Sequence, residues 1–224
     1  MARGDRAARC PLARRAAARR GFAGHDWLSP ACAALVAPVR GRVVGFGAGT
    51  TATLRHYGPP RCLVVVEPDP GVGVEIDHEA SALRLPVTVL AARPERLPLP
   101  SDAFDVVVSA LALCSVADQA AALAEARRVL APWGRLVFLE HIRSVGLPGR
   151  LQDLAAPLWS RLAGGCRPDR RTLPAITAAG FQITELEIVD ARGRSLAAPV
   201  VRGVATPPDQ RFAREARWLR GERT

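Results

Sequence analysis

The chain has no lysine and no asparagine, only one methionine and one tyrosine, and 5% aromatic side chains. All 31 basic residues are therefore arginines, and the net charge is +10. The excess lies at the ends: residues 1–20 hold seven arginines and one aspartate, and residues 206–224 hold five arginines and three acids. The stretch between them carries only about two positive charges, so the high net charge does not indicate a nucleic-acid partner.

Long apolar runs are also absent. No stretch reaches the roughly 18 apolar residues of a membrane span, and the first residues lack the apolar segment of a signal peptide. The cysteines are odd in number and widely spaced, with no C-x-x-C pair: Cys10, Cys32, Cys62, Cys114 and Cys166. This pattern favours free thiols in a reducing compartment over a disulfide framework or a zinc site, and we expect a cytoplasmic protein.

The length and the 49% hydrophobic content suit one domain with a full core. We expect a basic, mobile arm over residues 1–22, the domain over 23–206 and a basic tail over 207–224. The first twenty residues carry a net charge of +6 without a consistent apolar stripe. Any membrane contact through this arm is therefore expected to be peripheral and to require anionic lipid. The sequence gives no indication of the oligomeric state.

Strand-like apolar runs alternate with helical patterns along the chain. The expected strands lie at 42–46, 62–67, 86–90, 104–110, 134–140, 181–189 and 198–205, and the clearest helix covers 117–130. This order predicts an α/β fold, a Rossmann-like doubly wound sheet of seven mostly parallel strands with helices on both faces. Only residues 190–195 separate the last two strands, too few for a crossover helix, so that final hairpin should be antiparallel. Residues 145–172, with helical stretches broken by proline and glycine, predict a lid-like insertion over the cleft.

The most informative segment is a glycine turn between the first two expected strands. Gly47-Ala48-Gly49-Thr50 follows the apolar pair Val43-Val44, and Glu67 ends the second strand. Glycines let a ligand approach a helix N-terminus, and a carboxylate about twenty residues further on can accept both hydroxyls of a ribose. The segment therefore predicts a nucleoside-bearing cofactor. Because Gly47-x-Gly49-x-x-Ala52 also satisfies the dinucleotide fingerprint, this segment alone leaves NAD and S-adenosylmethionine both open.

Two later segments distinguish these cofactors. Residues 95–108 read ERLPLPSDAFDVVV and residues 126–136 read ARRVLAPWGRL. In order and spacing they resemble the polar loop, fourth strand and turn of class I S-adenosylmethionine-dependent methyltransferases. Too few residues remain for the substrate domain of a nicotinamide enzyme.

More specific motifs follow: ALALCSV at 110–116, Glu140-His141, and Gly165-Cys166. Over about residues 40–205 the chain resembles the methyltransferase-like family with a type 11 domain, which includes alkyl thiol methyltransferases. The resemblance implies S-adenosylmethionine as the cofactor and a small, apolar acceptor, with a thiol as the first choice. An O- or N-methyltransferase of a lipid or secondary metabolite is the nearest alternative, and a non-catalytic relic of the fold is the other.

The resemblance also implies a set of site residues. Those expected at the cofactor are Gly45, Gly47, Ala48, Gly49, Thr50, Glu67, Pro68, Glu95 and Leu111, and those expected at the acceptor are Leu113, Cys114, Trp159 and Cys166. His141 is the expected general base, because an imidazole can take a proton at neutral pH. Since neighbouring strand residues face opposite ways, Glu140 and His141 should not both face the cleft. No metal is expected.

Three positions depart from the family pattern. Gly45 stands where relatives have an acid, Thr51 where they have a third glycine, and Arg93 where an aspartate commonly faces the adenine. An arginine cannot accept the hydrogen bond of the adenine amino group. Cofactor affinity is therefore expected to be low, or supported by other contacts.

Overall fold

A computed structural model describes residues 28–47, 50–189 and 199–208. These residues form a seven-stranded sheet of order β3-β2-β1-β4-β5-β7-β6. The strands are β1 (Arg42–Phe46), β2 (Cys62–Val66), β3 (Val87–Leu90), β4 (Phe104–Ala110), β5 (Leu130–His141), β6 (Gln182–Val189) and β7 (Val200–Thr206). The first five run parallel, and β7 pairs antiparallel with both β5 and β6. The predicted fold is confirmed, including the antiparallel final hairpin.

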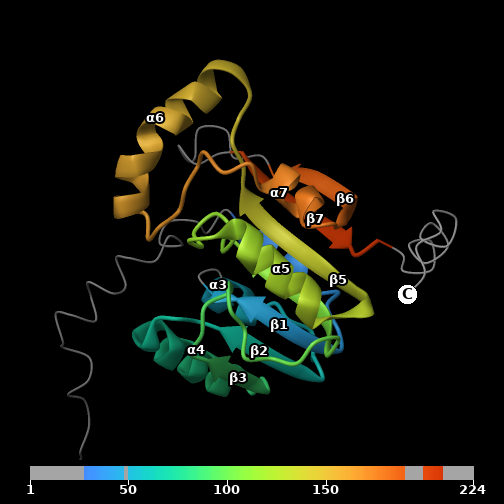
Figure 1. Ribbon diagram of the computed structural model, residues 1–224. Helices are drawn as coiled ribbons and strands as arrows, with labels where there is room; N and C mark the ends of the chain where they lie inside the picture. Colours follow the sequence, from blue (N-terminus) through green and yellow to red (C-terminus); the bar gives the residue numbers. More distant parts are fainter. Residues whose placement is uncertain (1–27, 48–49, 190–198, 209–224) are drawn as a thin grey trace, which may run out of the picture.

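The helices cover both faces of this sheet (Figure 1). One face is covered by α2 (Ser29–Val36), α3 (Thr50–Leu54) and α4 (Pro70–Leu83), and the other by α5 (Gln119–Val129) and α7 (Thr172–Ala178). Strand residues alternate between the two cores: Val43 packs on the α2 side and Val44 on the α5 side, and both are fully buried. Burial on both faces explains the continuous apolar runs of the central strands.

The turn after β2 is held by side-chain caps. The Asp69 carboxylate accepts hydrogen bonds from the backbone N–H groups of Gly71 (2.8 Å) and Val72 (3.4 Å) and so caps α4, which begins with Pro70. Glu67 Oε1 in turn accepts the backbone N–H of Asp69 at 2.9 Å. Backbone N–H groups at the start of α4, which have no partner within the helix, thereby gain one, and the end of β2 is fixed at the carboxyl edge of the sheet.

Strand β5 begins four residues earlier than the apolar run predicts. It follows α5 directly at Leu130 and includes Pro132, which is exposed at a shift in the register between β4 and β5. Gly134 makes this irregularity feasible, because a Cβ atom there would lie 2.9 Å from Leu130 Cδ2 and 3.1 Å from the carbonyl oxygen of Phe104. The glycine is therefore required by close packing of backbone.

Helix α6 (Gly146–Leu162) lies within the expected insertion and stands apart from the sheet in Figure 1. Its inner face is anchored by Gln152, whose Oε1 accepts the backbone N–H of Ser144 at 2.6 Å. Its outer face carries a row of leucines that are 58–80% exposed: Leu147, Leu151, Leu154, Leu158 and Leu162. None of the helices in the described ranges has the length and apolar character needed to cross a bilayer.

Candidate active site

A cavity of about 310 Å³ opens at the carboxyl ends of the central strands. It is lined by loops that follow β1, β2, β3, β4 and α6, with the residues Gly47, Glu67, Pro68, Arg93, Pro94, Glu95, Ala112, Ser115, Val116, Ala117 and Gly164. This is the edge at which open α/β sheets bind ligands. Of the residues predicted for the cofactor, the cavity brings together Gly47, Glu67, Pro68 and Glu95.

Glu67 and Gly47 form a cradle in this cavity. Glu67 is only 6% exposed, and burial raises the pKa of its carboxyl group. Its Oε2 lies 3.1 Å from the position that a Cβ atom would take on Gly47, closer than most real Cβ contacts. Any larger residue at position 47 would press on the carboxylate. The arrangement fits a ribose, whose hydroxyls can donate to an acid at the bottom of a side-chain-free turn.

The opposite wall of the cavity includes Arg93, one of the three residues that depart from the family pattern. Arg93 lines the cavity and is exposed, next to the buried Pro94. Glu95 Oε1 accepts the backbone N–H groups of Ala117 (2.8 Å) and Asp118 (3.3 Å), so it fixes the loop that precedes α5. The carboxylate thus positions the wall of the cavity, and its predicted contact with the cofactor stays a prediction.

Other residues predicted for the cofactor lie elsewhere. Ala48 and Gly49 fall outside the described residues, and Thr50 is described only as the first residue of α3. Gly45 is buried within β1, and a Cβ atom on it would point at Tyr57, Val65 and Leu63. An acid at position 45 would therefore enter the core beside a tyrosine hydroxyl and would not line the cavity.

Leu111 is the first residue after β4 and adopts a left-handed backbone conformation, with φ of +53°. Its side chain is buried in the core and does not line the cavity. The backbone is held there by a 2.7 Å hydrogen bond from its N–H to the carbonyl oxygen of Leu139. Such a conformation in a leucine is strained and persists because its surroundings fix it. It turns the following residues back across the end of the sheet.

Glu140 organises that turn, a role that the sequence analysis did not assign. Its carboxylate is fully buried and accepts hydrogen bonds from the Ser109 hydroxyl at 2.6 Å and from three consecutive backbone N–H groups, those of Ala112, Leu113 and Cys114, at 3.0–3.1 Å. Burial raises the pKa of Glu140, while these donors oppose the rise. The only hint in the sequence is an acid and a serine, each at the end of an otherwise apolar strand.

Beside this network, three predicted residues meet in one buried cluster. His141 Nδ1 lies 3.4 Å from Cys166 Sγ and 3.7 Å from Cys114 Sγ, and all three side chains are at most 6% exposed. A hydrogen bond between the two thiols lowers the pKa of Cys166 and raises that of Cys114. The three short motifs that resemble thiol methyltransferases, at 110–116, 140–141 and 165–166, therefore converge on one point.

The cluster borders the cavity through neighbouring residues. Ser115 and Gly164 line the cavity next to Cys114 and Cys166 respectively, although the cluster residues themselves do not. The Arg167 N–H donates to the Cys114 carbonyl oxygen at 3.0 Å, which ties the loop after α6 to the loop after β4. Gly164 is not among the predicted site residues, because a glycine between helical stretches is equally typical of a plain turn.

The remaining two residues predicted for the acceptor are packing residues in the structure. Leu113 is fully buried in the core cluster beneath α5, on the far side of the sheet from Cys114. Trp159 is partly buried on α6 and packs against the core that contains Cys114 and Cys166. Neither lines the cavity, so acceptor contacts for both stay predictions.

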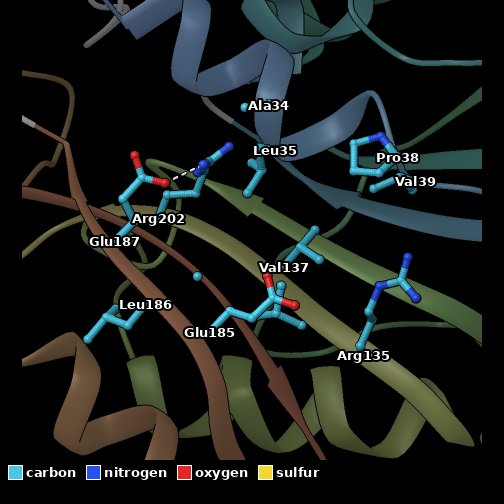
Figure 2. A pocket seen from close by; sticks show the side chains of 12 residues that line it. Ala34, Leu35, Pro38, Val39, Arg135, Val137, Glu185, Leu186, Glu187 and Arg202 are labelled. Carbon is cyan, nitrogen blue, oxygen red and sulfur yellow. Dashed lines mark hydrogen bonds and ion pairs between the residues drawn. The ribbon is translucent and has the colours of Figure 1, made fainter.

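A second cavity, of about 560 Å³, lies between α2 and the strands β5, β7 and β6 (Figure 2). Apolar residues such as Leu35 and Val137 share it with an ion pair between Arg202 and Glu187. It is larger than the first, yet none of the predicted site residues lines it. It also lies away from the carboxyl ends of the parallel strands, so the smaller cavity is the candidate site.

Comparisons with known proteins agree with this geometry. Residues 43–138 match a family model described as a methyltransferase domain. Thiol S-methyltransferase TMT1A of Homo sapiens is 32% identical over 151 residues, 65% of this chain and 62% of that protein. TMT1B of Rattus norvegicus is 34% identical over 147 residues, 63% of this chain and 60% of that protein. The matched region thus spans about three fifths of these relatives' length.

Solved structures share the fold. A methyltransferase from Thermotoga maritima, described as a possible histamine N-methyltransferase, has a TM-score of 0.61 at 22% identity and covers 83% of this chain and 93% of that one. Geranyl diphosphate methyltransferase in complex with S-adenosylmethionine has a TM-score of 0.59 at 13% identity, over 81% and 85% of the two chains. At these identities the likeness concerns the fold alone.

Proposed function

We propose that the chain is a class I S-adenosylmethionine-dependent methyltransferase that transfers a methyl group to the sulfur of a small, apolar thiol. The match to a methyltransferase domain implies S-adenosylmethionine as the cofactor. Its sulfonium supplies an activated methyl group, so the protein's part is to align the acceptor, remove its proton and exclude water.

For the cofactor, we assign the ribose hydroxyls to Glu67 and the close approach of the methionine end to Gly47. The support is the buried carboxylate facing a turn without side chains. Pro68 and Glu95 complete the walls of this part of the cavity. Because Arg93 cannot accept from the adenine amino group, adenine recognition falls to backbone carbonyl groups on this wall.

For the acceptor, the observation that carries the proposal is the cluster of Cys114, His141 and Cys166 beside the cavity. A free thiol has a pKa near 8.5 and is mostly protonated at pH 7, so a base next to the bound sulfur accelerates the transfer. We propose that the acceptor enters between Ser115 and Gly164 and that its proton passes to His141. The similarity to two thiol S-methyltransferases favours sulfur over oxygen or nitrogen as the acceptor atom.

The test begins with cofactor binding. Calorimetric titration with S-adenosylmethionine and S-adenosylhomocysteine should give one site per chain with saturable binding. No measurable heat with either ligand, at protein concentrations where a methyltransferase control binds, would identify the chain as a non-catalytic relic.

The acceptor is then tested with a matched series of an alkyl thiol, alcohol and amine that share one carbon skeleton. Methylation is followed by mass spectrometry of the product and by release of S-adenosylhomocysteine. The thiol should be methylated at least tenfold faster than the other two, because only its sulfur ionises readily near neutral pH. Preferential methylation of the alcohol or amine would refute the thiol assignment.

A further inference from the structure

The cluster of Cys114, His141 and Cys166 has the dimensions of a metal site. One ligand atom from each residue, Sγ, Nδ1 and Sγ, lies within 4.8 Å of the other two. For tetrahedral zinc, with Zn–S bonds of about 2.3 Å and Zn–N bonds of about 2.0–2.1 Å, the expected S···N separation is about 3.6 Å. The observed separations of 3.4 and 3.7 Å lie on either side of that value.

Two of the three ligands have their backbone held from outside the cluster. The backbone N–H of Cys114 donates to the Glu140 carboxylate at 3.1 Å, and the Thr172 hydroxyl donates to the carbonyl oxygen of His141 at 3.3 Å. Thr172 is itself fixed by the Gln119 side chain, at 3.2 Å. The backbone that carries Cys114 and His141 is therefore fixed independently of the contacts within the cluster.

We propose that Cys114, His141 and Cys166 bind a zinc ion. Two thiolates and an imidazole are soft and borderline ligands, which suit zinc and disfavour calcium or magnesium. The burial of all three side chains shields the thiolates from solvent oxidants. Three protein ligands leave a fourth tetrahedral position, the arrangement typical of zinc sites that exchange a ligand.

A bound ion would join three parts of the chain that are far apart in sequence: the loop after β4, the end of β5 and the loop after α6. It would thus hold helix α6 and the loop after it against the sheet at the edge of the cavity. Here the inference deepens the proposed function and rests on it. An acceptor thiol that reached the fourth position would bind as a thiolate and release its proton to solvent, and after receiving the methyl group of S-adenosylmethionine it would leave as a thioether. In the zinc-loaded protein Nδ1 of His141 would be a ligand, so the ion would activate the thiol, and the role of His141 as base proposed above would apply to the zinc-free chain.

The spacing rules for zinc sites do not detect this cluster. Its ligands occupy positions 114, 141 and 166, and no two of them lie within one turn or hairpin as in a zinc finger. Spacing alone therefore argues against a zinc site. The ligands are brought together by the sheet, whose parallel strands β4 and β5 end at the same edge.

The site is tested first by metal content. The full chain is purified with reductant and without chelator, equilibrated with zinc, freed of loose metal on a desalting column, and measured by inductively coupled plasma mass spectrometry. We expect about one zinc per chain in the wild type and at least a fivefold loss in Cys114→Ser and Cys166→Ser. Cys62→Ser is the matched control, because Cys62 is a free thiol in β2 away from the cluster. It should keep its zinc.

A second measurement uses the wild type, so that the proposal can be tested even if the cysteine variants fail to fold. Cobalt added to the zinc-free wild type should give thiolate-to-cobalt charge-transfer absorption and the intense visible bands of a tetrahedral site, and zinc should displace both. Wild-type zinc content no higher than that of Cys166→Ser, or cobalt bands typical of octahedral oxygen ligands, would overturn the proposal.

The failure of this inference can be distinguished from that of the proposed function. Stoichiometric zinc in a chain that binds S-adenosylhomocysteine but methylates no thiol leaves the metal site standing and refutes the acceptor. Equal thiol methylation by the zinc-loaded and zinc-free proteins, with metal content measured in both, refutes the part assigned to the ion in catalysis.

Discussion

Replacing Glu67 by glutamine should separate cofactor binding from folding. In the variant the amide oxygen can still accept the backbone N–H of Asp69, as Oε1 does at 2.9 Å. The amide nitrogen then occupies the position of Oε2 beside Gly47, where it can donate but cannot accept. The change therefore removes the acceptor for the ribose and leaves the cap of α4 intact.

The magnitude follows from the hydrogen bonds at stake. A hydrogen bond to a charged group contributes about 1.5–3 kcal/mol, and each 1.4 kcal/mol is a tenfold change in affinity. Loss of one such bond should weaken S-adenosylhomocysteine binding by about 10- to 150-fold. Glu67→Ala, which loses both oxygens, should weaken binding at least tenfold and also lower stability, because the N–H of Asp69 loses its partner.

The Glu67→Gln variant should bind the cofactor more weakly but should not be less stable toward unfolding. Burial raises the pKa of Glu67, so the folded protein binds a proton more tightly than the unfolded chain. Folding stability from this group is therefore lost as pH rises from the unfolded pKa through the raised folded pKa, and at neutral pH the buried charge is a cost. We expect the melting temperature of Glu67→Gln at pH 7 to equal or exceed that of the wild type.

The assay is isothermal titration at two pH values, with differential scanning calorimetry on the same samples. Wild-type affinity should fall as pH is lowered through the raised pKa of Glu67, and that of the glutamine variant should not. Asp77→Asn, which removes an exposed charge from α4, is the control and should bind normally. An unchanged dissociation constant in Glu67→Gln would remove this residue from the cofactor site.

The remaining predictions concern catalysis, acid stability and membrane contact. His141→Gln should lower turnover of a fixed thiol about a hundredfold at pH 7 with little change in cofactor affinity, and higher pH should partly restore it; full activity at pH 7 would contradict this. Asp105 has a pKa lowered to about 2, chiefly by the Arg42 side chain. The stability that it contributes is present above its unfolded pKa and is lost as pH falls through about 2, so Asp105→Asn should cost about 1 kcal/mol at pH 7 in urea unfolding and progressively less as the pH falls toward 2. Deleting residues 1–20 should abolish salt-sensitive sedimentation with anionic vesicles and leave cofactor affinity unchanged; an intact chain that does not sediment at low salt would show the arm to be a solvated tail.

Much of the fold was predictable because it depends on patterns that the chain carries locally. Continuous valine runs indicate buried parallel strands, and parallel strands end at one edge, which places Gly47 and Glu67 together without any knowledge of packing. The short link over 190–195 was enough to predict the antiparallel hairpin. Strand β5 was predicted too short, because a proline argues against a strand interior and Pro132 is accommodated only by a local register shift.

The inner part of the site was less predictable for a physical reason. Glu140 is organised by three backbone N–H groups, and the direction of a backbone N–H follows from dihedral angles such as the left-handed φ of Leu111, which no side-chain pattern encodes. Likewise, each cluster residue was named singly, but their convergence depends on the path by which the chain returns from α6. Period-2 alternation predicts opposite directions for Glu140 and His141, yet both side chains are buried and both contact Cys114.

The position of β7 constrains how this molecule can be made. Strand β7 lies between β5 and β6, although it is the last of the three to leave the ribosome. Until residues 200–206 emerge, β5 has an open edge and β6 has no partner in the sheet. Open edges invite pairing with other chains, so synthesis passes through an aggregation-prone stage that ends only once β7 has emerged. A chain shortened to residue 198 would keep every residue of both the cavity and the cysteine–histidine cluster, and we expect it to be insoluble.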